Sequence, residues 1–160
     1  LCWKAYKTLH KIILGLGSNQ GNRKKNLLEA IDLISNIPTD NLVKSSIQET
    51  EPYGFKEQEF FLNMVISGIT TLSPIEYLTA IKEIEVALGR KETFRWGPRI
   101  IDIDILFYDD MVVNEKKLII PHPDIANRLF VLVPLAEIAP TLVHPVLKKS
   151  IQTLLDEKVA

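Results

Sequence analysis

The chain has 160 residues, of which 46% are hydrophobic and 24% are charged, and its formal net charge is -1. This is the size and composition of one ordinary globular domain, and the near-neutral balance gives no general attraction to nucleic acids or to anionic membranes. The single cysteine excludes an internal disulfide and indicates a reducing compartment, while no apolar run approaches the ~20 residues of a membrane span.

The first predicted element is a short buried strand at residues 11–16. The sequence Gly15-Leu16-Gly17 lacks the full spacing of a nucleotide-binding loop, and we interpret it as a tight turn from this strand into a helix. That helix is predicted because apolar residues between Leu27 and Ile34 recur at spacings of three and four, and Pro38 ends it.

Two strands are predicted next, at residues 42–50 and 61–70, with a polar, glycine-containing loop at 51–59 between them. The loop and the start of the second strand are rich in aromatic residues. Such residues are typical of ordinary core, but they also suit a flat heteroaromatic ligand when polar groups lie nearby. The candidate residues for such a ligand are Phe61, Phe130, Asn63 and Thr50.

The second helix has the clearest start in the sequence. Ser73, Pro74 and Glu76 supply an N-cap, a proline at the first helical position and a capping-box glutamate, and Gly89 suits the C-terminal end. Its expected inner face consists of Leu78, Ile81 and Leu88. Glu85 falls on that same face, where an apolar residue is expected.

The remaining predicted elements are a strand at 100–108, a small hairpin within 111–120, a proline-punctuated stretch and a helix from Ser150. The order strand, helix, strand, strand, helix, strand favours an α+β fold with a ferredoxin-like βαββαβ core. In this fold helices pack on an antiparallel sheet, and we expect three α/β/α layers. A doubly wound parallel sheet fits less well, because no helix separates the two middle strands.

Paired carboxylates mark the strand at 100–108 as the segment that carries chemistry. Alternation along a strand places Asp102 and Asp104 on one face. The other face is predicted to carry Ile101, Ile103, Ile105 and Phe107. Two carboxylates on one face need cations, and such oxygen ligands suit Mg²⁺ that also binds substrate phosphates. The alternative is an edge strand with solvated aspartates.

Basic residues directly precede these aspartates, at Arg90, Lys91, Arg95 and Arg99. The planar guanidinium group suits phosphate oxygens, so this cluster beside paired carboxylates indicates phosphoryl transfer. Alone, it is typical of a solvated loop. His122 lies between two prolines that hold its backbone, which favours a fixed role, whereas a lone histidine is more often structural.

At this point the chain resembles the 6-hydroxymethyl-7,8-dihydropterin pyrophosphokinase family of folate biosynthesis, from about Ile12 to Leu155. The motifs that carry the resemblance are Gly17-Ser18-Asn19 with Gly21-Asn22-Arg23, Arg95-Trp96-Gly97-Pro98-Arg99 with Asp102-x-Asp104, and Pro121-His122 with Asn127-Arg128. The resemblance implies a ferredoxin-like core and a magnesium-dependent reaction. In that reaction a pterin hydroxymethyl oxygen attacks the β-phosphorus of ATP, the pyrophosphoryl group moves and AMP leaves.

By position, the resemblance also implies the roles of individual residues. Asp102 and Asp104 correspond to the ligands of two Mg²⁺ ions, and the catalytic set further comprises Arg90, Arg99 and Arg128. The residues implied to bind the nucleotide are Glu85, Arg95, Trp96, Arg99, Ile105, His122 and Arg128. The residues implied to bind the pterin are Thr50, Tyr53, Phe61, Asn63, Trp96 and Phe130, with the two phenylalanines enclosing the ring.

The chain departs from the family at Glu51, where proline is common, and at Lys82, where an amide side chain is often found. Residues 1–11 lie outside the resemblance and are expected to be an N-terminal extension or linker, with the pyrophosphokinase domain at 12–160. The family is often fused to dihydroneopterin aldolase or dihydropteroate synthase. The N-terminus has no apolar stretch of a signal peptide, so we expect a cytoplasmic protein. The small-molecule substrates, ATP and a hydroxymethyl dihydropterin, are what the resemblance implies.

Two other functions are compatible with these residues. One is a different ATP-using transferase with another acceptor alcohol, although the aromatic pair favours a flat acceptor. The other is a non-catalytic ferredoxin-like binding module, which would leave Asp102 and Asp104 beside the basic cluster without a purpose.

Overall fold

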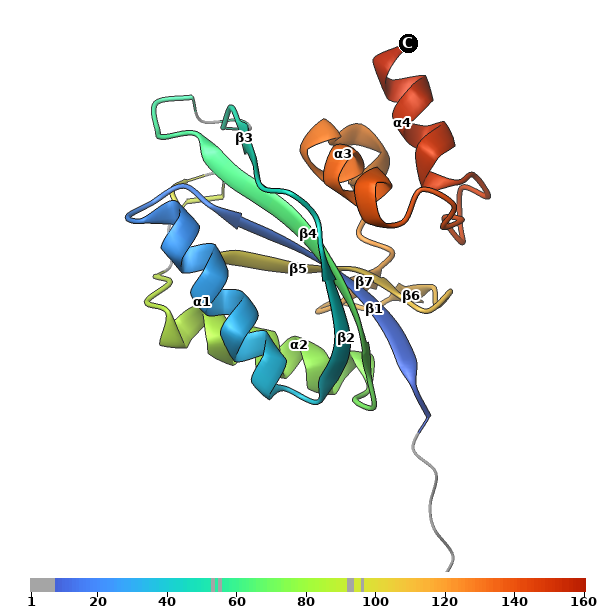
Figure 1. Cartoon of the computed structure of the whole chain (residues 1–160), viewed down its shortest axis with the longest axis horizontal. Helices are drawn as coiled ribbons and strands as arrows, with labels where there is room; N and C mark the ends of the chain where they lie inside the picture. The colour runs from blue at the N-terminus through green and yellow to red at the C-terminus, as the bar shows by residue number, and fades with distance from the viewer. Residues whose placement is uncertain (1–7, 53, 55, 92–93, 96) are drawn as a thin grey trace, which may run out of the picture.

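The computed structural model describes residues 8–52, 54, 56–91, 94–95 and 97–160. The elements, shown in Figure 1, are β1 (His10–Ser18), α1 (Arg23–Asn36), β2 (Thr39–Lys44), β3 (Gln48–Thr50), β4 (Phe61–Thr70), α2 (Pro74–Ala87), β5 (Asp102–Tyr108), β6 (Val113–Asn114), β7 (Ile119–Ile120), the 3-10 turn η1 (Ile125–Asn127), α3 (Leu129–Ile138) and α4 (Ile151–Val159). None of the helices in the described residues is long and apolar enough to cross a membrane.

The main sheet has the strand order β2-β4-β1-β5, and β3 also pairs with β4. Every pairing in it is antiparallel. Because β4 lies between β1 and β2, and β1 lies between β4 and β5, helices α1 and α2 each connect strands that are not neighbours, which is the split βαβ arrangement. The predicted ferredoxin-like α+β core is therefore confirmed. The first strand starts at His10, so the sheet includes the last two residues of the range 1–11.

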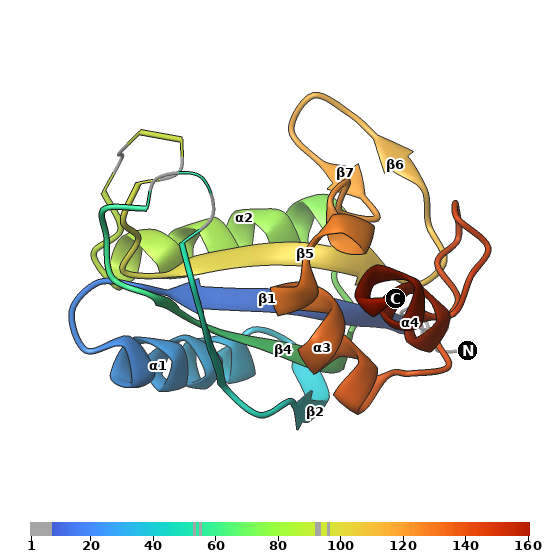
Figure 2. The same ribbon diagram turned by 90° about the horizontal axis from the view of Figure 1, so that it is seen from above.

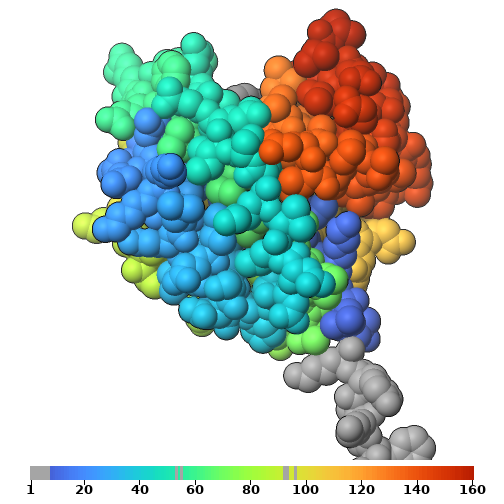
Figure 3. All heavy atoms as spheres, in the orientation of Figure 1, coloured from blue at the N-terminus to red at the C-terminus, as the bar shows by residue number. Residues whose placement is uncertain are grey.

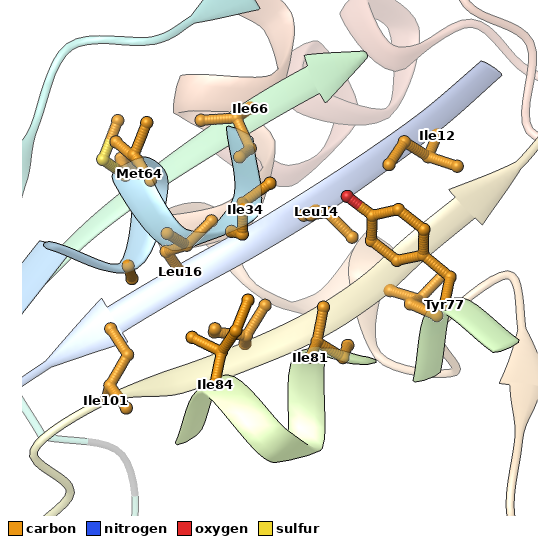
Figure 4. Close-up of a cluster of buried hydrophobic side chains, with 14 of the residues drawn as sticks. Ile12, Leu14, Leu16, Ile34, Met64, Ile66, Tyr77, Ile81, Ile84 and Ile101 are labelled. Atoms are coloured by element: carbon orange, nitrogen blue, oxygen red, sulfur yellow. The ribbon is translucent and has the colours of Figure 1, made fainter. Parts of the chain in front are cut away.

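Helices cover both faces of the sheet and form the expected three layers. In Figures 1 and 2, α1 and α2 lie against one face, and α3 and α4 lie against the other. The larger apolar cluster lies between the sheet and α1 and α2, and Figure 4 shows part of it around Leu14, Ile34 and Ile81. The second cluster lies on the opposite face and joins Ile13 and Val65 to α3 and α4. Alternate residues of β1 thus serve two cores.

Local signals position the helices as the sequence predicts. The Ser73 side chain accepts from the N–H of Glu76, and the Glu76 carboxylate accepts from the N–H of Ser73, which completes a capping box at the start of α2. Gly89 follows α2 with a φ of +93°, a conformation that suits glycine. The inner face differs in part, because the buried residues are Tyr77, Ile81, Ile84 and Glu85, whereas Leu78 and Leu88 are only partly buried.

Three predictions about strands need correction. The segment 42–50 lies in two strands rather than one, because β2 ends at Lys44 and β3 begins at Gln48. Ser45 still bonds to Val65 of β4 through its N–H and its hydroxyl at 2.9 Å, but the N–H of Ser46 donates to the Glu137 carboxylate instead. Gly15-Leu16-Gly17 is not a turn: these residues lie within β1 and pair with both β4 and β5. Simple alternation also fails near the end of β5.

The failure in β5 has a clear cause. The register shifts between Ile13 and Leu14, so that Leu106 is an extra residue opposite β1. A bulge of this kind moves the following side chains to the opposite face. Phe107 therefore packs with α3 and α4 and not with Ile103 and Ile105 as predicted.

Helix α3 was not predicted. Its sequence, LFVLVPLAEI, is apolar at most positions, so it shows no periodicity, and Pro134 is typical of a helix end. The structure buries Val131, Leu132, Pro134 and Leu135 against the sheet.

Candidate active site

A cavity of about 310 Å³ opens at the end of the sheet that α3 and α4 leave uncovered. Figure 3 shows the molecule hollowed between the lobe around β3 and the lobe of α3 and α4. The cavity is lined by Gly15, Leu16, Gly17, Thr50, Glu51, Phe61, Asn63, Met64, Val65, Arg90, Arg95, Gly97, Arg99, Asp102, Asp104, Leu106, His122, Arg128, Phe130 and Val131. Most of the sequence-predicted site residues are therefore brought together.

The glycines of β1 form part of the cavity wall, and the sequence interpretation missed this role. Gly15 and Gly17 lie two residues apart on one strand, so they share a face. A Cβ at Gly17 would lie 2.9 Å from Oδ1 of Asn63, which is too close for a real contact. Because glycine has no side chain, the backbone of β1 itself forms this part of the cavity wall. A Gly-x-Gly spacing inside a predicted strand is the signal that identifies such a surface.

Asp102 and Asp104 reach the cavity from β5, on the face opposite Ile103 and Ile105. The two carboxylates differ in environment. Oδ1 of Asp102 lies 3.2 Å from Nη1 of Arg90, and its side chain is 37% exposed. Burial, followed by the negative charge of Asp102, raises the pKa of Asp104 to about 7. Additional positive charge in the cavity would therefore favour the ionised form of both carboxylates.

Glu85 lies behind this pair and not in the cavity wall. Its side chain is only 3% exposed and forms ion pairs with Arg90 and, at 3.0 Å, with Nζ of Lys82. It also accepts a 3.0 Å hydrogen bond from the N–H of Ile103. A buried carboxylate thus links α2 to β5 and holds Arg90 next to Asp102.

Ile105 was also implied to contact the nucleotide. Its side chain is 5% exposed and packs in the core on the side of α1 and α2, away from the cavity.

The basic loop before β5 contributes Arg95 and Arg99 to the cavity. The Arg99 guanidinium donates to backbone carbonyls of its own loop, those of Phe94, Arg95, Gly97 and Pro98, at 3.2–3.4 Å. These contacts fold the loop around the arginine. Trp96, the remaining predicted member of this segment, lies outside the described residues.

The opposite wall comes from the segment that precedes α3. Arg128 forms a 3.1 Å ion pair with Asp124, and its guanidinium lies 5.6 Å from the ring centre of Phe130. Burial, and then the charge of Arg128, lowers the pKa of His122. Nδ1 of His122 accepts from the N–H of Asp124 at 3.3 Å, so the neutral imidazole carries its proton on Nε2. His122 is therefore a neutral donor at neutral pH.

Polar and aromatic groups meet at the end formed by β3 and β4. Nδ2 of Asn63 donates to Oγ1 of Thr50 at 2.6 Å, and the ring of Phe61 lines the same part of the cavity. Glu51 lies at the cavity edge, with a carboxylate oxygen 3.7 Å from Nζ of Lys56. Tyr53 falls outside the described residues. Phe61 and Phe130 come from different lobes, so a flat ligand between them would contact both.

The donor set fits a magnesium ion that is shared with a substrate. Among the residues that the structure describes, no three His, Cys, Asp or Glu side chains gather into a group suited to a metal. Two carboxylates, Asp102 and Asp104, are nevertheless the ligands that Mg²⁺ typically takes from a protein when phosphate oxygens and waters complete its shell.

Comparison with known proteins gives a consistent result. The sequence profile of a family described as 7,8-dihydro-6-hydroxymethylpterin-pyrophosphokinase (HPPK) matches residues 13–140. The chain is 43% identical over 141 residues to the 2-amino-4-hydroxy-6-hydroxymethyldihydropteridine pyrophosphokinase of Aquifex aeolicus (strain VF5), covering 88% of each protein. It is 43% identical over 131 residues to the mitochondrial folate synthesis bifunctional protein of Arabidopsis thaliana, covering 82% of this chain and 24% of that one.

A solved structure supports the fold. The crystal structure of Plasmodium falciparum HPPK-DHPS wild type with pteroate matches with a TM-score of 0.77 at 18% identity, over 98% of this chain and 44% of that one.

Proposed function

The chain belongs to the 7,8-dihydro-6-hydroxymethylpterin-pyrophosphokinase family, and we propose that it transfers a pyrophosphoryl group from ATP to 6-hydroxymethyl-7,8-dihydropterin in folate biosynthesis, releasing AMP. One observation carries this function. The carboxylates of Asp102 and Asp104 lie in one cavity with four arginines and with two phenylalanines, Phe61 and Phe130. The cavity thus combines features that suit a polyphosphate with features that suit a flat ring.

We assign the binding of two Mg²⁺ ions to Asp102 and Asp104. When bound together with ATP, these ions would neutralise the negative charge of the oxygens on the phosphates next to the bond that breaks. Arg90, Arg95, Arg99 and Arg128 bind the phosphates, and Nε2–H of His122 donates to a phosphate oxygen. Trp96 belongs to the proposed nucleotide set by its position in the sequence. Glu85 acts through Arg90, which it holds in place.

The acceptor binds between Phe61 and Phe130. Its polar edge faces the amide of Asn63 and the hydroxyl of Thr50, which are already hydrogen-bonded to each other at 2.6 Å. Tyr53 belongs to the same proposed set by its position in the sequence. The bare strand surface at Gly17 leaves room for the ring edge beside Asn63.

The reaction is a displacement at the β-phosphorus of ATP. The hydroxymethyl oxygen forms a bond with that phosphorus and loses its proton to solvent, the bond from the phosphorus to the oxygen bridging the α- and β-phosphates breaks, and AMP leaves with that oxygen. Catalysis of phosphoryl transfer consists mainly of alignment and of charge compensation. The arginines and the two aromatic rings supply these by fixing the donor and the acceptor in one cavity.

We assign residues 12–160 to the pyrophosphokinase domain and residues 1–11 to an extension or linker. The single cysteine is consistent with a reducing compartment, and we propose the cytoplasm.

The test is incubation of the protein with ATP, Mg²⁺ and 6-hydroxymethyl-7,8-dihydropterin, with separation of the nucleotide products. We expect AMP and not ADP, and we expect Asp102→Ala to lose nearly all turnover. Asp32→Asn, which changes an exposed aspartate on α1, is the matched control and should keep full activity. Formation of ADP, or ATP binding without any turnover of the pterin, would contradict the proposed reaction.

A further inference from the structure

The turn between β1 and α1 contacts two loops that border the cavity. One is the loop at 51–60, between β3 and β4, and the other is the loop at 88–101, between α2 and β5. Figure 2 shows both loops at the same end of the sheet. Within the turn, Asn19 is 2% exposed although it is polar, and it does not line the cavity.

The Asn19 side chain bonds to both loops. Its Oδ1 accepts from the backbone N–H of Arg99 at 2.8 Å. Its Nδ2 donates to Oε1 of Gln58 at 2.8 Å and to the carbonyl of Glu59 at 3.1 Å. The backbone N–H of Asn19 also donates to the carbonyl of Arg99 at 3.0 Å. One buried amide therefore ties the phosphate-side loop to the acceptor-side loop.

A second side chain from the same turn holds the acceptor side. Nη1 of Arg23 donates to the carbonyl of Phe60 at 2.8 Å and lies 2.8 Å from a carboxylate oxygen of Glu49. These two partners directly precede Phe61 and Thr50, which line the cavity. The acceptor-side loop is thus fixed where it enters β4 and where it leaves β3.

We infer that Asn19 is a positioning residue for pyrophosphoryl transfer, because its amide sets the distance between the loop carrying Arg99 and the loop leading to Phe61. This inference rests on the proposed function. Neither loop can shift without breaking a bond to Asn19, and buried amide groups that lose a partner are strongly disfavoured. Misplacement of reacting groups by about 1 Å costs about a hundredfold in rate.

The experiment compares Asn19→Asp and Asn19→Ala with the wild type and with Asn22→Ala. The aspartate keeps an oxygen for the N–H of Arg99 but loses the donor to Glu59, whereas the alanine loses both links. Asn22 lies in the same turn and caps α1, where its side chain accepts from the N–H of Lys25. Its replacement is therefore a control for destabilisation of this turn.

Two measurements are made below the melting temperature of all four proteins. The first is kcat at saturating ATP and pterin, which we expect to fall tenfold to a hundredfold in both Asn19 variants and to stay within twofold in Asn22→Ala. The second is amide hydrogen exchange. The N–H of Arg99 should exchange faster in Asn19→Ala but not in Asn19→Asp, while the N–H of Gly97, which donates to the carbonyl of Phe94, serves as the internal reference.

The outcomes separate this inference from the proposed function. Asn19 variants that match Asn22→Ala in kcat, or an Arg99 amide that exchanges equally in all four proteins, would overturn the positioning role. If Asn19→Ala does not fold, Asn19→Asp decides the kinetic question alone. A wild-type protein that forms no AMP would instead defeat the proposed function, and hydrogen exchange would still decide whether Asn19 links the loops.

Discussion

Replacing Asp104 with asparagine should stabilise the ligand-free protein while it abolishes pyrophosphoryl transfer. Burial and the charge of Asp102 raise the pKa of Asp104 from 3.8 to about 7, so the folded protein resists ionisation of this carboxyl. One pKa unit corresponds to about 1.4 kcal/mol, so the ionised carboxylate lowers the free energy of unfolding by about 4 kcal/mol above pH 7. Asparagine removes the charge but keeps a polar group in the site. We therefore expect a gain of about 2–4 kcal/mol at pH 8.

The free energy of unfolding should fall as the pH rises, because of where the proton on Asp104 is held. The folded state keeps a proton on Asp104 that the unfolded chain loses above 3.8, so the stability contributed by the protonated form is fully present below 3.8 and is lost as the pH rises through about 7. The free energy of unfolding of Asp104→Asn should therefore exceed that of the wild type by only about 1 kcal/mol at pH 4.5.

The assay is urea unfolding at pH 4.5 and pH 8, with EDTA and without nucleotide. Asp102→Asn removes the second cause of the raised pKa and should weaken the pH dependence. An Asp104→Asn protein that is no more stable than the wild type at pH 8 would refute the reasoning, because the site would then impose no penalty on the carboxylate.

Three further predictions concern the acceptor site and the core. Phe61→Ala and Phe130→Ala should each weaken pterin binding by roughly ten- to a hundredfold, as ring stacking is worth about 1–3 kcal/mol, and leave ATP binding nearly unchanged by calorimetry; equal losses for both ligands would contradict the assignment. Gly17→Ala should raise the KM for the pterin. The added Cβ would lie only 2.9 Å from Oδ1 of Asn63, so the Asn63 side chain would have to move. Gly15→Ala, where the nearest contact is 3.4 Å, is the comparison, and an unchanged KM in Gly17→Ala would argue against the bare surface. Burial raises the pKa of Tyr77 to about 12, so its contribution to stability is present below pH 10 and lost as the pH rises through 12. Tyr77→Phe should weaken the alkaline loss of stability between pH 9 and pH 11 by about 1 kcal/mol, and equal slopes in denaturant titrations would disprove this.

Much of the fold follows from local signals in the sequence. The capping box at Ser73 and the mostly apolar run of β4 place their elements correctly, because these features depend only on neighbours along the chain. The bulge at Leu106 and the role of Gly15 and Gly17 depend on which strands lie beside β1 and β5, and no local pattern records that. Helix α3 escaped prediction because its sequence is apolar at most positions and therefore shows no distinct apolar stripe.

In the candidate site too, some features can be predicted from the sequence and others appear only in the folded structure. Residue types and spacing identify Asp102, Asp104 and the arginines, since charge pairing is visible in a linear sequence. The contacts of Glu85 are not visible there, because they join a helix to a strand 18 residues away. The motif residue Asn19 likewise shows its partners only in three dimensions, at Gln58 and Arg99.

The bond between Glu85 and the N–H of Ile103 also covers part of an edge of the sheet. Strand β5 lies at the edge of the sheet, and exposed edges recruit strands from other molecules. Here the N–H of Ile103 donates to the Glu85 carboxylate, and the carbonyl of Leu106 accepts from the N–H of His122 at 3.0 Å, so neither group is available to another strand. The same carboxylate that holds Arg90 therefore also bonds one of the edge groups that a strand from another molecule would need, and we expect loss of Glu85 to lower the solubility of the folded protein as well as its activity.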